Sequence, residues 1–200
     1  MDANAKQRQQ IADCAVDLFR KSSYDKVSVN EICAAAGVTR SAFYSLFQGK
    51  KSILDFILSQ PKENLESAFL DFVDLENDFE RIWCLCDRFV TIAMSFGPRL
   101  TGDLFIMQLN APVGITEAVH SLDSWFIKLA GNCVRAGIIE TEEPVEVIAP
   151  MATSLICQAT YEWCNRGGSF NLREMARTYA EIAYHVVPRY RMTPEQRAAL

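Results

Sequence analysis

Apolar residues recur along the chain at the spacing of a helix. From Ala5 to Lys21 they follow i, i+3, i+4, i+7 and i+8, which is one buried stripe opposite a charged face. The stripe consists of Ile11, Cys14, Ala15, Leu18 and Phe19. The chain has no Asn-Gly or Asp-Gly hairpin turn and no sustained period-2 alternation, the two main signs of paired strands. We therefore expect an all-α fold.

Capping residues and glycines mark two short helices after the first. Ser28-Val29-Asn30-Glu31 is a capping box, in which the serine accepts from an orphan amide and the glutamate reaches back, so a second helix begins there. Gly37 ends it. Thr39 caps a third helix, RSAFYSLF, which Gly49 closes before a fourth begins at Lys50 or Lys51.

The rest of the chain consists of longer helical stretches separated by proline and glycine. The fourth helix carries an apolar stripe and is expected to kink or end near Pro61. Further helices are expected over residues 78–96, 98–110, 116–136, 145–165 and 172–187. A polar tail follows from Arg189 onward. We expect a small domain at 1–50 and a larger helical domain at 51–200.

The two expected domains differ in charge, which indicates that they bind different kinds of partner. Half of the 200 residues are apolar, enough for a sizeable core, and no stretch reaches the ~18 uncharged apolar residues of a membrane span. The start MDANAKQRQQ is too polar for a signal peptide, so we expect a cytoplasmic protein. The net charge is −5, yet residues 1–51 hold eight Lys or Arg against five Asp or Glu. A basic module on an acidic body fits a domain that meets a polyanion.

The two short helices around Gly37 have the organisation of a helix-turn-helix. In that motif the second helix enters the major groove of DNA amino end first. A tight turn between steeply crossing helices needs one position with positive φ, which Gly37 adopts without a Cβ penalty. A small core of Ile32, Val38, Phe43 and Phe47 is expected to set the crossing angle. Capped short helices also occur in bundles that never bind DNA, so this pattern alone leaves both interpretations open.

The face of the third helix opposite Phe43 and Phe47 is the predicted reading surface. It carries Arg40, Ser41, Tyr44, Ser45 and Gln48. The Arg40 guanidinium can donate two hydrogen bonds to a guanine edge, and the serine hydroxyls can bond a base or a phosphate. The Tyr44 hydroxyl suits a phosphate.

Three further positions are predicted to meet the DNA backbone. Ser28 and Thr39 lie at helix amino ends, where free amides and a partial positive charge attract a phosphate. Lys50 adds a charge at the start of the fourth helix. Such contacts position the module on DNA without specifying sequence.

The residues of this module occur in an ordered combination: LF at the end of the first helix, S/T-V-x-x-I in the second, the turn AGV, Y-x-x-F in the third and the lysine that follows. With them, residues 8–57 resemble the TetR family of bacterial regulators. The resemblance implies a sequence-specific DNA-binding transcriptional regulator, with a three-helix helix-turn-helix domain joined to a C-terminal helical bundle for ligand binding and dimerisation. It also implies that Thr39, Arg40, Ser41, Tyr44 and Ser45 line the major groove, with Ser28, Tyr44 and Lys50 on phosphates. Leu46 departs from the family pattern, which leaves its role open.

Family membership further implies partners. TetR-like proteins are usually repressors that a small molecule releases from double-stranded DNA, and their last two helices pack across a two-fold axis. The resemblance thus implies a homodimer through residues 145–165 and 172–187 and an inverted-repeat operator. Both helices carry apolar residues on more than one face, more than a single core-facing stripe requires.

Aromatic residues in the middle helices suggest the kind of ligand. A pocket lined by aromatic groups with few polar anchors would suit a small lipophilic or aromatic molecule. The candidate ligand-binding residues are Trp83, Phe105, Met107, Trp125, Gln158 and Tyr161. Aromatic residues at helical spacing also build ordinary cores, so the alternative is a TetR-like DNA-binding protein without a ligand, either architectural or recruiting a partner.

The remaining chemistry-bearing residues indicate neither an enzyme nor a metal site. The seven cysteines sit singly in apolar helical patterns, so we expect reduced core thiols, with a redox switch at Cys84 and Cys86 as the alternative. His120 and His185 lack a metal-ligand partner at i+3 or i+4. No catalytic or phosphate-loop constellation is present in a plausible context, and we expect no cofactor.

Overall fold

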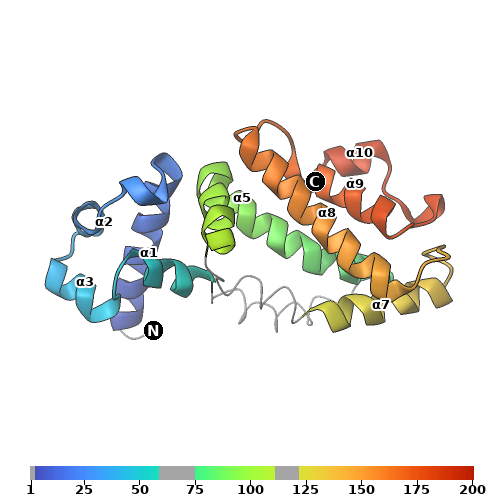
Figure 1. Ribbon diagram of the computed structural model, residues 1–200, viewed down its shortest axis with the longest axis horizontal. Helices are drawn as coiled ribbons and strands as arrows, with labels where there is room; N and C mark the ends of the chain where they lie inside the picture. The colour runs from blue at the N-terminus through green and yellow to red at the C-terminus, as the bar shows by residue number, and fades with distance from the viewer. Residues whose placement is uncertain (1–2, 59–74, 111–121) are drawn as a thin grey trace.

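The computed structural model describes residues 3–58, 75–110 and 122–200, and within these ranges the regular structure is helical apart from one bridge between Ile139 and Val186. The expected all-α fold is confirmed. Figure 1 shows two parts side by side, which we call the head and the body. The head comprises α1 (Ala3–Lys21), η1 (Tyr24–Lys26), α2 (Val29–Ala36), α3 (Arg40–Leu46) and a helical segment over residues 50–58. The body comprises α5 (Asp78–Asn110), α7 (Asp123–Arg135), α8 (Val145–Asn165), α9 (Leu172–Ala183), η3 (Pro188–Tyr190) and α10 (Pro194–Ala198).

The head is held together by one apolar cluster beneath its short helices. The predicted core positions Ile32, Phe43 and Phe47 are buried in it, and Val38 packs against its edge. The buried face of α1 contributes Ile11, Ala12, Ala15 and Phe19. The same cluster includes Phe96, Leu100 and Leu104, which belong to α5. The second half of α5 is therefore part of the head core.

A kink divides α5 where two separate helices are expected from the sequence. Gly97 adopts φ 76° and ψ 166° inside the helix, and Pro98 follows without an amide hydrogen. The buried Thr101 hydroxyl donates to the Ala93 carbonyl at 3.0 Å across the kink. The first half of α5 packs in the body core and the second in the head core, so this one helix joins the two parts.

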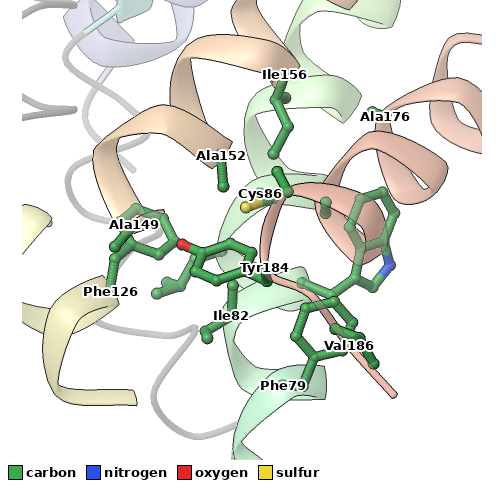
Figure 2. Packing of buried hydrophobic residues seen from close by; sticks show 14 of the residues in the cluster. Phe79, Ile82, Cys86, Phe126, Ala149, Ala152, Ile156, Ala176, Tyr184 and Val186 are labelled. Atoms are coloured by element: carbon green, nitrogen blue, oxygen red, sulfur yellow. The ribbon is translucent and has the colours of Figure 1, made fainter. Parts of the chain in front are cut away.

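The body core lies between α5, α7, α8 and α9, as Figure 2 shows from close by. α8 spans Val145–Asn165, as expected from the sequence. The prediction of a last helix over residues 172–187 is wrong at its end, because α9 stops at Ala183. His185 takes φ 53°, and the Val186 amide donates to the Glu181 carbonyl at 3.0 Å, which is the hydrogen-bond pattern of a Schellman cap. Residues 185–187 then pair with residues 138–140.

The expected polar tail after Arg189 is folded. Thr193 and Gln196 form a capping box that begins α10. The Arg197 guanidinium donates to Glu181 at 2.7 Å, and Leu200 packs against the body core. The segment is therefore ordered by contacts with the bundle rather than by its own composition.

A buried ionic network fastens α9 to α5 and α10. Arg177 has no exposed surface; it donates to both carboxylate oxygens of Glu80 at 2.6 and 2.8 Å and to Glu181 at 2.8 Å. Its guanidinium lies over the rings of Phe79 and Trp83, 4.9 and 5.3 Å from their centroids. The Arg177 charge is thus paired with carboxylates, and aromatic rings cover the flat faces of its guanidinium.

Two expectations concern residues outside the described ranges, namely the kink near Pro61 and the beginning of the helix predicted over 116–136, with His120 in it. Within the described ranges, no helix has the length and hydropathy needed to cross a membrane.

Candidate nucleic-acid interface

The turn between α2 and α3 is built by the capping residues that the sequence indicates. The Ser28 hydroxyl oxygen accepts from the Glu31 amide at 3.3 Å, and Glu31 accepts from the Ser28 amide at 2.7 Å, which completes the capping box. Hydrogen bonds from Ser28 lower the pKa of Glu31, so the carboxylate form holds the cap. Gly37 takes φ 65° and ψ 31°, and the Val38 amide returns to the Cys33 carbonyl at 3.0 Å. Both predicted helix ends are confirmed.

α3 turns one polar face away from the head core. The Thr39 hydroxyl oxygen accepts from the Ala42 amide at 3.1 Å and begins the helix. Phe43 and Phe47 are buried, which leaves the opposite face to solvent. Its exposed side chains are Thr39, Arg40, Ser41, Tyr44, Ser45 and Gln48. The Arg40 guanidinium lies 5.9 Å from the centroid of the Tyr44 ring, and Leu46 packs against the head core.

Lys50, one of the residues predicted to contact the DNA backbone, is held by other residues of the protein. It is half-buried, and its ammonium donates to the Tyr24 carbonyl at 2.7 Å and lies 4.5 Å from the centroid of the Tyr24 ring. Its charge also lowers the pKa of Glu31, which places the ammonium near the amino end of α2. Ser28, at that end, is exposed.

The Tyr24 peptide connects Lys50 to α5. The Tyr24 amide donates to Asp103 Oδ2 at 2.7 Å, while its carbonyl accepts from Lys50. The loop after α1 is thus held from both sides, by the second half of α5 and by the start of the helical segment 50–58. The contacts join residues 79 and 26 positions apart, so no local sequence pattern could have indicated them.

Arg8 is a second cation of the head that the sequence analysis did not single out. It is exposed, and its guanidinium lies 5.1 and 4.6 Å from the ring centroids of Phe47 and Phe56. The aromatic pair orients the charge at the edge of the head, where α1 meets the end of α3.

The candidate ligand residues lie in different environments. Phe105 and Tyr161 meet edge-on at 6.4 Å between ring centroids, with Tyr161 half exposed. Trp83 is buried in the body core beneath Arg177, while Met107 packs against the head core. Trp125 and Gln158 are exposed. The described contacts therefore bring one pair of the six together.

Gln158 instead borders a groove of about 220 Å³ between α8 and α9. The groove is lined by Gln158, Ala159, Glu162, Arg166, Phe170, Met175 and Tyr179. On the same two helices, apolar side chains reach solvent at Val147, Met151, Leu155, Tyr161 and Ile182. These five residues form an exposed apolar set, which includes Ile182 at 56% exposure.

All seven cysteines lie in the described part of the chain, and none of them forms a disulfide there. Burial raises the pKa of the Cys86 and Cys157 thiols, and it raises that of Cys133 to about 12 and that of Cys164 to about 11. A thiol of this kind carries little thiolate at neutral pH and reacts slowly with oxidants. At these four positions, Cys86 among them, the environment favours a reduced core thiol over a redox switch.

Comparisons with known proteins agree with the geometry of the head. Residues 11–56 match the family described as "Bacterial regulatory proteins, tetR family". The uncharacterized HTH-type transcriptional regulator TtgW of Pseudomonas putida is 33% identical over 81 residues, 40% of this chain and 60% of that relative. The chain thus covers less than two thirds of the relative's own length.

Solved structures share the whole fold. The fatty acid degradation regulator FadR of Bacillus halodurans matches with a TM-score of 0.69 at 16% identity, over 89% of this chain and 94% of that one. FadR of Bacillus subtilis, solved in complex with stearoyl-CoA, matches with a TM-score of 0.68 at 18% identity, over 90% and 98%. Over residues 11–56 the head of this chain therefore matches the TetR family of bacterial regulatory proteins, and the chain as a whole has the helical fold of these solved structures.

Proposed function

We propose that this regulator is a cytoplasmic repressor that binds an inverted-repeat operator with α3 in the major groove and leaves it when a small lipophilic or aromatic ligand binds the body. One observation supports the DNA contact above all others. The exposed face of α3 carries polar side chains, and its opposite face is locked into the head core by Phe43 and Phe47. A helix held this way can enter a groove without losing its own packing.

The proposed contacts divide into two kinds. Arg40, Ser41 and Ser45 stand on the exposed face and are proposed to reach base edges, with Arg40 on a guanine. Ser28, Thr39, Tyr44 and Lys50 are proposed to hold the flanking phosphates. For Lys50 we propose that the ammonium keeps its bond to the Tyr24 carbonyl and turns a remaining hydrogen toward DNA.

The test uses DNA that the wild-type protein selects from a random pool. Arg40→Ala is expected to lose about 1–3 kcal/mol of binding, concentrated at one base pair of each half-site. Lys50→Ala is expected to weaken binding on every sequence and to reduce the salt slope by about one unit. Arg135→Ala, an exposed cation on α7, serves as the control with no expected effect. If Arg40→Ala keeps full affinity and base preference, α3 is not the reading helix.

The exposed apolar set of α8 and α9 supports a homodimer. Association of two copies through Met151, Leu155 and Ile182 would remove apolar surface from water, and a two-fold axis would match an inverted repeat. Ile182→Asp should shift the mass in light scattering from dimer to monomer and weaken operator binding, whereas Val134→Asp, at an exposed apolar position on α7, should change neither. A monomeric wild-type protein at micromolar concentration would contradict this part of the proposal.

The ligand class is proposed from the aromatic residues of the body and from the shared fold. FadR of Bacillus subtilis was solved with stearoyl-CoA, which is a property of that protein. For this chain we propose a small lipophilic or aromatic molecule. Mass spectrometry of small molecules released from the purified protein tests the class, and a protein that never carries or binds such a molecule would favour an architectural or partner-recruiting regulator.

A further inference from the structure

Tyr184 places a polar atom in the middle of an apolar core. Its side chain has no exposed surface, and its hydroxyl has no hydrogen-bond partner among the residues that the structure describes. Figure 2 shows the ring reaching across the body core, with the hydroxyl directed toward Ala149 on α8 and Phe126 on α7. A buried hydroxyl without a partner destabilises a protein, so its presence requires a reason.

The backbone around Tyr184 keeps the hydroxyl in place. Tyr184 is the capping residue of α9, and its amide donates to the Ala180 carbonyl at 3.0 Å. His185 follows in the left-handed conformation, and the Val187 amide donates to the Ile138 carbonyl at 2.9 Å. The ring also meets Phe79 edge-on at 6.0 Å between centroids. Because the chain is fixed on both sides of Tyr184, the hydroxyl cannot swing out to water.

The surroundings of the hydroxyl decide what it can bind. Ala149 and Ala152 contribute small side chains from α8, beside Cys86 of α5. Burial, followed by the charges of Cys86, Cys133 and Asp123, raises the pKa of Tyr184, so the phenol stays protonated and acts as a donor. An anionic ligand is disfavoured here, because its charge would lose its water in an apolar core whose described residues offer no cation beside the hydroxyl.

We infer that the Tyr184 hydroxyl is the hydrogen-bond donor that anchors the effector of the body, and that this effector is a neutral lipophilic molecule with a carbonyl or similar acceptor. The inference rests on the proposed function in taking the body as the ligand-binding part. It adds the anchoring atom and excludes carboxylates as the anchored group. The apo protein retains an unsatisfied donor, and ligand binding satisfies it.

The first test is the stability of the ligand-free full-length protein. Tyr184→Phe keeps the ring and removes the hydroxyl. If that hydroxyl is an unsatisfied donor in the ligand-free protein, the melting temperature should rise by about 2–4 °C. Tyr190→Phe, which removes a hydroxyl from the partly exposed Tyr190, should leave it unchanged. A fall in the melting temperature of Tyr184→Phe would overturn the inference, because it would mean that the hydroxyl is satisfied in the free protein by an ordered water.

The second test uses three probes of one shape: acetophenone, ethylbenzene and benzoate. Acetophenone at millimolar concentration should raise the melting temperature of the wild type more than ethylbenzene does, and benzoate should have no effect. In Tyr184→Phe the advantage of acetophenone over ethylbenzene should disappear. An equal effect of acetophenone and ethylbenzene on the wild type, or an advantage that survives in Tyr184→Phe, would overturn the inference.

Operator binding separates this inference from the proposed function. Tyr184→Phe lies far from α3 and should bind the selected DNA as tightly as the wild type, but acetophenone should no longer release it. If neither protein binds DNA, the proposed function fails whatever the melting curves show. If both bind DNA and both respond equally to acetophenone, the proposed function stands and the Tyr184 anchor is refuted.

Discussion

Arg177 allows the stability of the body to be tested at a single side chain. It is fully buried, pairs with Glu80 and Glu181 and lies against two aromatic rings. Arg177→Ala would leave the buried Glu181 with Arg197 as its remaining cation, at 2.7 Å. Removing one partner of a buried pair costs about 3–5 kcal/mol, and the lost ring contacts add to this. In a chain of this length that corresponds to a fall of roughly 6–20 °C in melting temperature.

The matched control is another arginine–glutamate pair four residues apart. Arg166 and Glu162 lie 3.4 Å apart with 60% and 49% of their side chains exposed, and such a pair contributes less than about 1 kcal/mol. Urea unfolding of Arg177→Ala and Arg166→Ala, followed by circular dichroism, compares the two sites directly. Arg177→Met should lose less than Arg177→Ala, since it keeps the packing. If the Arg177→Ala and Arg166→Ala losses are equal, the network does not hold α9 to α5.

Three further predictions follow from individual contacts. Asp103→Ala should weaken operator binding, because it frees the Tyr24 loop that holds Lys50. Asp103→Asn keeps an acceptor for the Tyr24 amide and should bind nearly as the wild type does. Equal losses of affinity in the two variants would show that the Asp103–Tyr24 hydrogen bond does not position Lys50. The lowered pKa of Glu31 means that its contribution to head stability is present at neutral pH and is lost as the pH falls through that pKa. The stability deficit of Glu31→Gln relative to the wild type, measured by urea unfolding, should therefore shrink as the solution is acidified. Cys133, with a pKa raised to about 12, should resist iodoacetamide at pH 8 until the protein unfolds, and rapid labelling of the native protein would contradict its burial.

Local signals predicted the head well because its helix ends depend on local chemistry. The cap at Ser28, the left-handed Gly37 and the cap at Thr39 each act within a few residues, and the structure contains all three. The spacing of Phe43 and Phe47 likewise decided which face of α3 is exposed, since only one side of that helix is apolar.

The end of the chain was not predictable in this way. α9 ends at Ala183, and His185, two residues later, takes the left-handed conformation that glycine usually takes after a helix, so the sequence held no glycine to mark the end. The order of the last residues comes from Arg197 and Glu181, which lie 16 positions apart, and a polar composition gave no sign of that contact. Periodicity could not separate buried Trp83 from exposed Tyr161, because the body helices carry apolar residues on more than one face.

The division of α5 between two cores links the site at Tyr184 to the DNA-reading head. Tyr184 packs on Phe79 in the first half of the helix, and Leu100 and Leu104 beyond the kink at Gly97 lie in the head core. A ligand that shifts the first half against the second must therefore alter the head or change the angle at Gly97. Such a ligand acts only through a difference in affinity between the two arrangements, so its hydrogen bond from Tyr184 must be better formed in one arrangement than in the other. Gly97→Ala strains the kink at φ 76°. It should therefore change the acetophenone concentration needed to release the protein from DNA. The advantage of acetophenone over ethylbenzene in raising the melting temperature without DNA should stay nearly the same, because that advantage depends on Tyr184.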